Sequence, residues 1–425
     1  ILRPPRSTQS RSSAASDVYK RQMHEFLRRG MVFAVGAGAN HVDNFWVAPA
    51  EYFTENFVSW AYTDSFRVIH ESIYDAAEAE PFQVGGTFRP ARIAIIISKS
   101  TDYNERLAEL NPAQDYFMKM CGNAPSKPKG ESRPEQATIC RADQQLLYLA
   151  LKHDQHAVDL ITEEDVLDGL LKNYQVVYFA GEWIDHRIIP VLQQWIQGGG
   201  IFYACAGLGH RNEFDEPDTG LLKLLGLKNV SPITRNALTI RPFLELQLIP
   251  PVDTINMDGK TIQAVAMRQE IEPDGAKVIA TWANGKPAAT VHEMGKGKAF
   301  AIGTAAGHTY YKTGLRKTPW GRGGRKTIYN PTNFDAAAAE LALLAVKAVE
   351  IQRDVECSNR FVESLVIDNT KGTLLTLINW DNAPLKGVNV KAKISFAPKS
   401  IKSVEQQKEI PFKYENGFAL FATDI

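Results

Sequence analysis

A cysteine at the end of an apolar run is the residue of this sequence best suited to covalent chemistry. Residues 195–210 read WIQGGGIFYACAGLGH, in which the run ending at Cys205 follows three glycines and precedes two more. This order is typical of a strand followed by a sharp turn, an arrangement that presents a nucleophile in many enzymes. A thiol becomes a nucleophile only where a neighbouring base or a helix N-terminus lowers its pKa. The pattern therefore raises the hypothesis of a nucleophile at Cys205.

The bulk composition excludes several other classes of function. Lys+Arg and Asp+Glu both number 48 among 425 residues, so no global charge points to nucleic acid or to an anionic membrane. No apolar run is long enough to span a bilayer. The four cysteines are scattered, without a CxxC pair or a metal-ligand spacing. We therefore expect neither a metal nor a cofactor.

The N-terminal segment needs separate treatment. Residues 1–22 are basic and rich in serine and have no apolar periodicity, so we predict a disordered tail. No apolar region follows the charges, as a signal peptide would require. The segment resembles a translated sequencing adapter of the kind found at the ends of metagenomic contigs. We therefore treat it as non-native and expect the native sequence to enter mid-domain near Met23.

Residues 23–85 carry a helix–strand–loop–helix pattern. Residues 23–37 predict a short amphipathic helix, and the alternating segment 40–47 predicts a strand. A second helix is predicted over about 63–79. The residues expected on its buried face are Phe66, Ile69, Ile73 and Ala76. A unit of this size cannot bury its own apolar face, so we interpret it as the tail of a larger α/β domain.

Residues 86–352 alternate between strands and helices. The continuous apolar run from Ile93 to Ile97 is typical of a strand covered on both faces in a parallel sheet. Further strands are expected at 175–181, at 201–207 and in a hairpin over 286–304. Helices are expected at 142–154, 166–174, 188–197 and 334–351. Because the connections are short, this alternation predicts an open doubly wound sheet.

The last part of the chain has an all-β pattern. From Arg353 onward, runs such as GTLLTLINW and VNVKAKISF are separated by the turn signals NTKG and YENG. We therefore predict a small antiparallel β-sandwich over 353–425.

These parts, in this order, resemble the family 42-type β-galactosidases, which are glycoside hydrolases. The resemblance is carried by LLYLALKHD, VVYFAG, WIQGGGIFYACAG and PAATVHEMGKGKAFAIGT. In that family a class I glutamine-amidotransferase-like domain, flavodoxin-like in its sheet, serves as the trimerisation domain. It lies between a catalytic (β/α)8 TIM barrel and a small β domain. The resemblance implies that 86–352 form this domain and 353–425 the β domain, and that 23–85 are the last strand and helix of a truncated barrel.

The resemblance places the catalytic residues outside this chain. Retaining glycosidases use two carboxylates about 5 Å apart, and in this family both lie on earlier barrel strands. We therefore expect no catalytic residue here. The C-terminal end of the last barrel strand faces the active site, so the candidate sugar-binding residues are Asn44, Trp46, Glu51 and Tyr52. Trp46 would stack on a pyranose face, or alternatively pack beneath the loop.

A cysteine enzyme is an alternative, with His308 as the base of Cys205. The amidotransferase pattern G-x-C-x-G is incomplete, because Gly207 is present but Tyr203 replaces its first glycine. Tyr310 stands where the family has an acidic residue after the base. The segment RNEFDEPDTG after the turn predicts a loop rather than an activating helix. The stronger interpretation of Cys205 is a small buried residue at a strand end.

Two further alternatives stay open. The ending GKGKAFAIGTAAGH also resembles the trehalose-utilisation-like branch of the same fold, which keeps open a sugar-related site near His308 and Glu182. A purely structural or carbohydrate-binding module is the other.

The interpretation that we place first is the non-catalytic C-terminal portion of a bacterial glycoside hydrolase, which completes the barrel and mediates oligomerisation. It implies a carbohydrate ligand in the complete enzyme, a homotrimer by analogy, and a location in the bacterial cytoplasm or periplasm.

Overall fold

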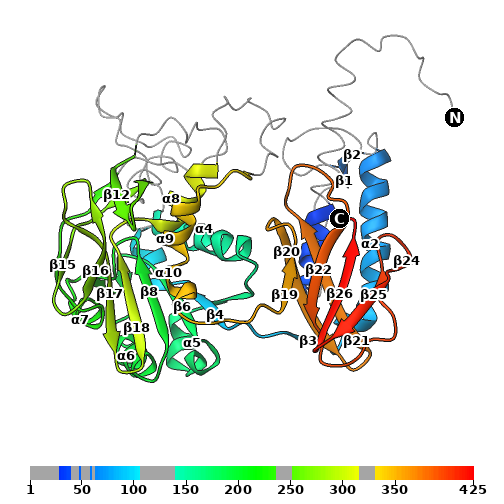
Figure 1. Cartoon of the computed structure of the whole chain (residues 1–425), viewed down its shortest axis with the longest axis horizontal. Helices are drawn as coiled ribbons and strands as arrows, with labels where there is room; N and C mark the ends of the chain where they lie inside the picture. Colours follow the sequence, from blue (N-terminus) through cyan, green and yellow to red (C-terminus); the bar gives the residue numbers. More distant parts are fainter. Residues whose placement is uncertain are drawn as a thin grey trace, which may run out of the picture. The chain divides into compact units, whose positions relative to one another are not determined.

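The chain folds into two compact units. The computed structural model describes residues 28–39, 47–48, 58–59, 63–105, 139–235, 251–314 and 331–425. Among the described residues, unit 1 takes in those up to Arg89 and 354–425, and unit 2 takes in those from Pro90 to Arg353 (Figure 1). Unit 1 is therefore made from two stretches far apart in sequence, and the α/β unit lies between them in the chain.

Unit 2 is built on a nine-stranded mixed sheet with the order β13-β12-β16-β17-β18-β8-β6-β4-β5. Its parallel strands are β18 (Gly297–Ile302), β8 (Ile201–Cys205), β6 (Val176–Ala180), β4 (Ile93–Ile96) and β5 (Val158–Ile161). An antiparallel extension consists of β17 (Pro287–Met294), β16 (Lys277–Trp282), β12 (Asp253–Met257) and β13 (Lys260–Ala264). The parallel part confirms the doubly wound sheet expected from the sequence.

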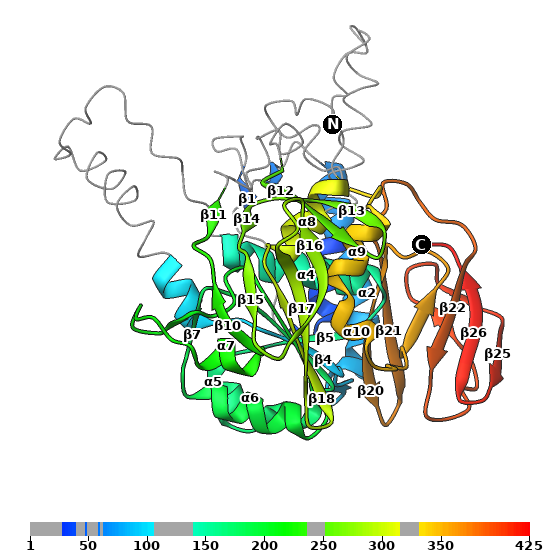
Figure 2. The same cartoon turned by 60° about the vertical axis from the view of Figure 1, so that its left-hand side comes forward.

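Helices cover both faces of this sheet (Figure 2). One layer contains α4 (Ile139–His153), α8 (Ala306–Gly314), α9 (Ala336–Ala342) and α10 (Leu344–Lys347). The other contains α5 (Glu163–Leu167), α6 (Ile188–Gln197) and α7 (Gly220–Leu224). Alternate residues of each strand enter opposite layers: in β8, Tyr203 and Cys205 join the α4 layer, whereas Phe202 and Ala204 join the α6 layer. The strand pleat therefore directs the Cys205 side chain toward α4 and α8.

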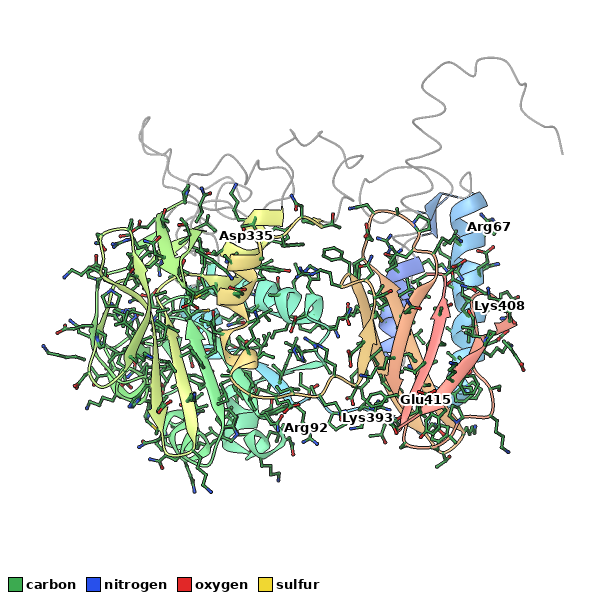
Figure 3. The ribbon with its side chains drawn as sticks, in the orientation of Figure 1. Arg67, Arg92, Asp335, Lys393, Lys408 and Glu415 are labelled. Carbon is green, nitrogen blue, oxygen red and sulfur yellow. The ribbon has the colours of Figure 1, made fainter. Side chains whose placement is uncertain are left out.

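Two predicted helices are interrupted. The helix predicted over 166–174 is instead α5 followed by a 3-10 turn, η1 (Leu170–Asn173). Gly169 separates them with a φ of +83°, a conformation that suits glycine. The helix predicted over 334–351 is divided into α9 and α10 at Leu343. Asp335 caps the first of these, because its Oδ1 accepts the Ala338 N–H at 2.8 Å (Figure 3).

Unit 1 contains a β-sandwich, as the sequence predicts for its C-terminal part. One sheet has the order β19 (Val355–Cys357), β22 (Val388–Lys393), β26 (Phe418–Thr423) and β25 (Phe412–Glu415). The other has the order β21 (Gly372–Asn379), β20 (Val362–Asn369) and β3 (Thr87–Phe88). Val362 and Val366 of β20 share one apolar core with Val390 of β22. β3 comes from the N-terminal part of the chain, which the sequence pattern did not indicate.

The N-terminal helix α2 (Thr63–Gln83) packs on β20 and β21. Its buried face differs from the expected one. Ile69 is buried as predicted, but Ile73 is 47% exposed, and Val68 and Ser72 are buried instead. Residues 28–36 are helical within the predicted helix 23–37. The prediction failed at Ile73 because a helical stripe fixes spacing but leaves the rotation of the helix to the surface it meets.

Several two-stranded pairs complete the fold. They are β1 (Val47–Ala48) with β2 (Val58–Ser59), β7 (Trp183–Ile184) with β9 (Arg211–Asn212), β10 (Leu227–Val230) with β15 (Ile271–Pro273), β11 (Thr234–Arg235) with β14 (Met267–Arg268), and β23 (Lys402–Ser403) with β24 (Lys408–Glu409). β1 overlaps the end of the strand predicted at 40–47, and the rest of that strand lies outside the described residues.

Candidate functional site

Cys205 is the last residue of β8 and is fully buried. Its Sγ donates to Oδ2 of Asp143 at 3.3 Å, and it accepts the N–H of Ala306 at the start of α8. Asp143 lies on α4, which covers the same face of the sheet. The thiol is therefore held between two helices rather than at a surface that a substrate could reach.

His308 belongs to the same buried cluster. Oδ1 of Asp143 accepts both the backbone N–H of His308 and its ring Nδ1, each at 2.7 Å. Asp143 and Cys205 together satisfy N–H groups in the first turn of α8, which would otherwise be orphaned in the protein interior. The cluster of Asp143, Cys205 and His308 thus caps a helix by contacts across the fold.

The order of the three groups differs from that of a nucleophile and its base. In a working triad the thiol or hydroxyl bonds to the imidazole, and the carboxylate orients the far side of the ring. Here the thiol bonds to the carboxylate of Asp143, and Nε2 of His308 has no hydrogen-bond partner among the described residues. Burial raises the pKa of the Cys205 thiol well above its usual value, and the charge of Asp143 raises it further. This environment keeps the sulfur protonated.

The strained turn after β8 falls one residue later than the sequence pattern placed it. A nucleophile elbow holds its reactive residue on a sharp, strained turn. In this turn the first left-handed residue is Ala206, with a φ of +52°, and Gly207 follows at +116°. No helix follows at once, since α7 begins only at Gly220. The elbow position is thus occupied by a methyl side chain, which offers no nucleophile.

Glu182 lies beside this turn. A Cβ added to Gly207 would come within 2.8 Å of Cα of Glu182, so the close approach of the two segments depends on glycine. The Glu182 carboxylate pairs with Arg235, and Nε2 of His210 lies 3.6 Å from it. The structure therefore joins Glu182 to Arg235 and His210, whereas His308 is held by Asp143. Neither Arg235 nor His210 was a candidate from the sequence.

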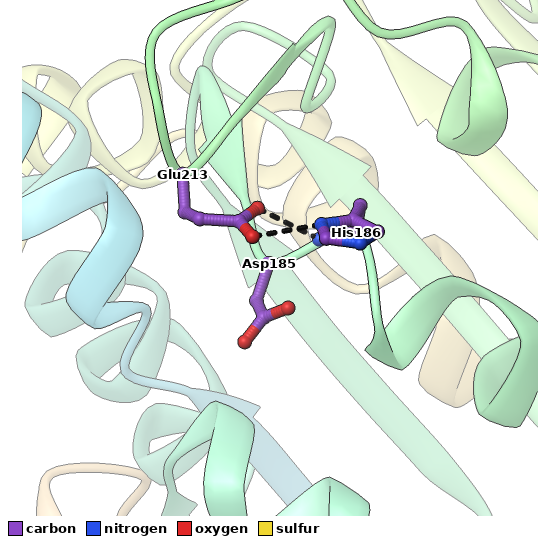
Figure 4. Close-up of side chains that lie close together, drawn as sticks. All are labelled: Asp185, His186 and Glu213. Carbon is purple, nitrogen blue, oxygen red and sulfur yellow. Dashed lines mark hydrogen bonds and ion pairs between the residues drawn. The ribbon is translucent and has the colours of Figure 1, made fainter.

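A second cluster joins Asp185, His186 and Glu213 (Figure 4). One ligand atom from each lies within 4.8 Å of the others. Glu213 already accepts the backbone N–H of His186 at 3.1 Å and bonds to its Nδ1 at 2.7 Å. Both Asp185 oxygens accept from Arg187. The donors are residue types that bind metals, but here they are engaged by one another and by a guanidinium. The sequence did not predict this cluster, because Glu213 lies 27 positions after His186 and is brought back beside β7 only by the fold of the intervening chain.

The predicted sugar-binding residues are not placed by the structure. Asn44, Trp46, Glu51 and Tyr52 lie outside the described residues, so their role stays a prediction.

Within the described part of the chain, no helix is both long and apolar enough to cross a bilayer.

Comparison with known proteins identifies the α/β unit. Residues 131–318 match the family model of the β-galactosidase trimerisation domain. The resemblance drawn from the sequence is confirmed for this domain. No curated protein is matched by the sequence. The matched region takes in β6, β8, β17 and β18, and with them the capped helix α8.

Solved structures show the same fold over most of the chain. A catalytic mutant of a GH42 β-galactosidase from G. stearothermophilus has a TM-score of 0.57 at 14% identity, covering 92% of this chain and 49% of that one. The β-galactosidase of Bacillus circulans sp. alkalophilus has a TM-score of 0.53 at 14% identity, covering 85% and 45%. An α-L-fucosidase isoenzyme from Paenibacillus thiaminolyticus has 0.52 at 12%, covering 95% and 56%. The chain thus spans about half the length of these structures.

Proposed function

We propose that this chain is the non-catalytic C-terminal portion of a β-galactosidase-like glycoside hydrolase and that it mediates assembly into a homo-oligomer, a trimer by analogy. The observation that carries the proposal is the match of residues 131–318 to a trimerisation domain. The fold shared with GH42 β-galactosidases along most of the chain supports it. In the complete enzyme, 23–85 would be the end of the barrel, 86–352 the trimerisation domain and 353–425 the β domain.

The chemistry of the described residues supports a non-catalytic role. Asp185 and Glu213 are close enough to resemble the carboxylate pair of a retaining glycosidase. A general acid of such an enzyme needs a raised pKa. Hydrogen bonding by Arg187 instead lowers the pKa of Asp185, which is only 5% exposed. The buried thiol of Cys205 is equally unsuited to attack a substrate.

Two measurements test this function. The purified chain, incubated with a chromogenic β-galactoside, should release chromophore no faster than a buffer blank, because the catalytic carboxylates belong to earlier barrel strands. Sedimentation velocity across a concentration series should show a discrete oligomer. Hydrolysis by the chain alone would contradict the non-catalytic assignment. A monomer at every concentration would contradict the assembly role.

We also propose that the complete enzyme binds its sugar partly through Asn44, Trp46, Glu51 and Tyr52. Trp46 would supply an aromatic face for a pyranose ring. Isothermal titration of the chain with galactose should then give weak binding that Trp46→Ala abolishes. Binding that is unchanged by this substitution would remove Trp46 from the subsite.

A further inference from the structure

A short loop after β8 is held rigidly by its own polar groups. It is the segment 211–217, closed by a bridge between Arg211 and Pro217. Within it, Oδ1 of Asn212 accepts the backbone N–H groups of Phe214 and Glu216, each at 3.0 Å. Asp215 adopts a left-handed φ of +64° and donates its N–H to the Asn212 carbonyl. These bonds give the loop one defined shape.

Groups outside the loop fix it from several sides. The indole Nε1 of Trp183 donates to Oδ1 of Asp215 at 2.6 Å, and β7 pairs with β9 at the base of the loop. The amide of Asn104 donates to the Glu213 carbonyl at 3.0 Å. His186 holds the Glu213 side chain, as Figure 4 shows. A loop held in this way loses little conformational entropy when its tip binds a partner.

The tip of this loop presents an aromatic ring to solvent. Phe214 is 71% exposed. Tyr103, on the neighbouring segment that Asn104 joins to the loop, is 65% exposed. Tyr103 and Phe214 are thus exposed aromatic side chains on two segments joined by a hydrogen bond, and aromatic side chains are enriched at the centre of protein interfaces. We call Tyr103 and Phe214 the aromatic tip.

The surrounding polar groups favour a protein partner over a sugar. A sugar site combines an aromatic face with polar groups that hydrogen-bond hydroxyls. Around Phe214 these groups are already engaged: Glu213 with His186, and Asp215 with Trp183 and Arg211. An apolar pocket on a protein needs no such donors, because burying the ring supplies the binding energy.

We infer that the aromatic tip is an anchor by which one copy of this chain binds another. The inference rests on the proposed assembly function and names the surface that would carry it. The loop lies within residues 131–318, the region matched as a trimerisation domain, while Tyr103 lies outside it. In a ring of three, each tip would enter a complementary pocket on the next copy, since such contacts are heterologous.

The test compares substitutions of the tip with a matched control in the full chain. Phe214→Ala should weaken self-association about thirtyfold, the effect of removing one interface anchor, and adding Tyr103→Ala should weaken it further. Tyr74→Ala is the control, because Tyr74 is 72% exposed and lies on α2 of the other unit. Dissociation constants come from sedimentation equilibrium. Melting temperatures measured at a concentration where every variant is monomeric should match that of the wild type, because the side chains removed are exposed.

Each outcome decides a different point. Loss of association in the tip variants alone supports the inference. An oligomeric wild type whose association is unchanged by Phe214→Ala overturns the inference and leaves the proposed function intact. A wild type that is monomeric throughout overturns the proposed function and the inference with it. Galactose binding that is lost in Phe214→Ala but retained in Tyr74→Ala would assign the tip to a sugar and overturn the protein partner.

Discussion

Two regions of unit 2 contain the same kind of pair, a carboxylate bonded to a histidine ring, in different surroundings. In the cluster that caps α8, Oδ1 of Asp143 and Nδ1 of His308 are 2.7 Å apart, and the two side chains are 0% and 3% exposed. In the cluster of Asp185, His186 and Glu213, Oε1 of Glu213 and Nδ1 of His186 are also 2.7 Å apart. The Glu213 and His186 side chains, however, are 19% and 52% exposed. Water can replace a lost partner in the second case and not in the first. The comparison teaches that burial, rather than the distance between the two groups, decides how much such a pair contributes to the free energy of unfolding.

Removing the buried carboxylate should have the largest effect. Asp143→Ala leaves the ring and N–H of His308 and the thiol of Cys205 without their acceptor. We expect the free energy of unfolding, measured by urea denaturation, to fall by about 3–5 kcal/mol, the usual result of breaking a buried pair. Asp143→Asn is the control, since it keeps an acceptor oxygen and should cost less. Equal stability of wild type and Asp143→Ala would contradict the capping role.

The reactivity of the thiol is the next largest expected effect. Because burial and Asp143 raise the pKa of Cys205, iodoacetamide should label it in the native protein at least about 100-fold more slowly than in urea. The thiolate fraction should stay small even at pH 9, where an ordinary thiol ionises. Peptide mass spectrometry measures the labelling at each cysteine. Fast and selective labelling of Cys205 would instead revive the alternative of a Cys205–His308 enzyme.

Substitution of Gly207, in the turn after β8, should lower the free energy of unfolding less than substitution of Asp143, but more than substitution of a glycine in open space. Gly207→Ala combines a φ of +116° with a Cβ 2.8 Å from the Glu182 backbone. We expect it to destabilise unit 2 by about 3 kcal/mol. Gly259→Ala is the matched control, because Gly259 also has a positive φ of +74° but has open space around its Cβ position. Its cost should be about 1 kcal/mol. Similar melting curves for the two variants would show that Gly207 meets no tight contact.

The pair of Arg187 and Asp185 should give the smallest effect on stability, because the Arg187 side chain is 59% exposed. Arg187→Ala removes the hydrogen bonds that lower the pKa of Asp185. A lowered pKa stabilises the folded state above the unfolded pKa near 3.9, and that stability is lost as pH falls through the folded pKa. The variant should therefore be slightly less stable than the wild type in urea denaturation at pH 7, and should match it near pH 2–3. Lys172→Ala, at another exposed cation, should show no such pH dependence. A loss that persists at pH 2 would point to a packing role for Arg187.

The sequence predicted the central strands of unit 2 and several of its helices, but not the contacts between them. Apolar runs such as that ending at Cys205 predicted buried strands, because burial on both faces leaves a continuous apolar pattern. The role of Asp143 could not be predicted, since Asp143 and Cys205 are 62 residues apart and meet only when α4 packs on the sheet. The sharp turn that the sequence offered as an alternative nucleophile elbow begins at Ala206 rather than at Cys205, because glycine spacing does not reveal which residue takes the left-handed conformation.

The same limit explains the other misses. The loop that carries Phe214 was predicted as irregular chain, and nothing in RNEFDEPDTG showed that its acids and its asparagine would close on one another. β3 is only two residues long, too short to carry a period of its own. Features made by side-chain hydrogen bonds, or by pairing with a distant strand, thus lay beyond the sequence pattern, whereas continuous apolar strands did not.

The pairing of β3 with β20 has a consequence for the order in which the chain is made. Arg89 bonds to Asp368, 279 positions later, and its Nη1 lies 3.9 Å from a carboxylate oxygen of Asp354. During synthesis β3 cannot pair with β20 until all of residues 90–353 have left the ribosome. The α/β unit therefore has time to fold before the β-sandwich is completed. Among the described residues the chain leaves unit 1 after Arg89 and returns at Asp354, so the α/β unit resembles an insertion, and the Arg89 side chain lies beside a carboxylate at its other attachment point.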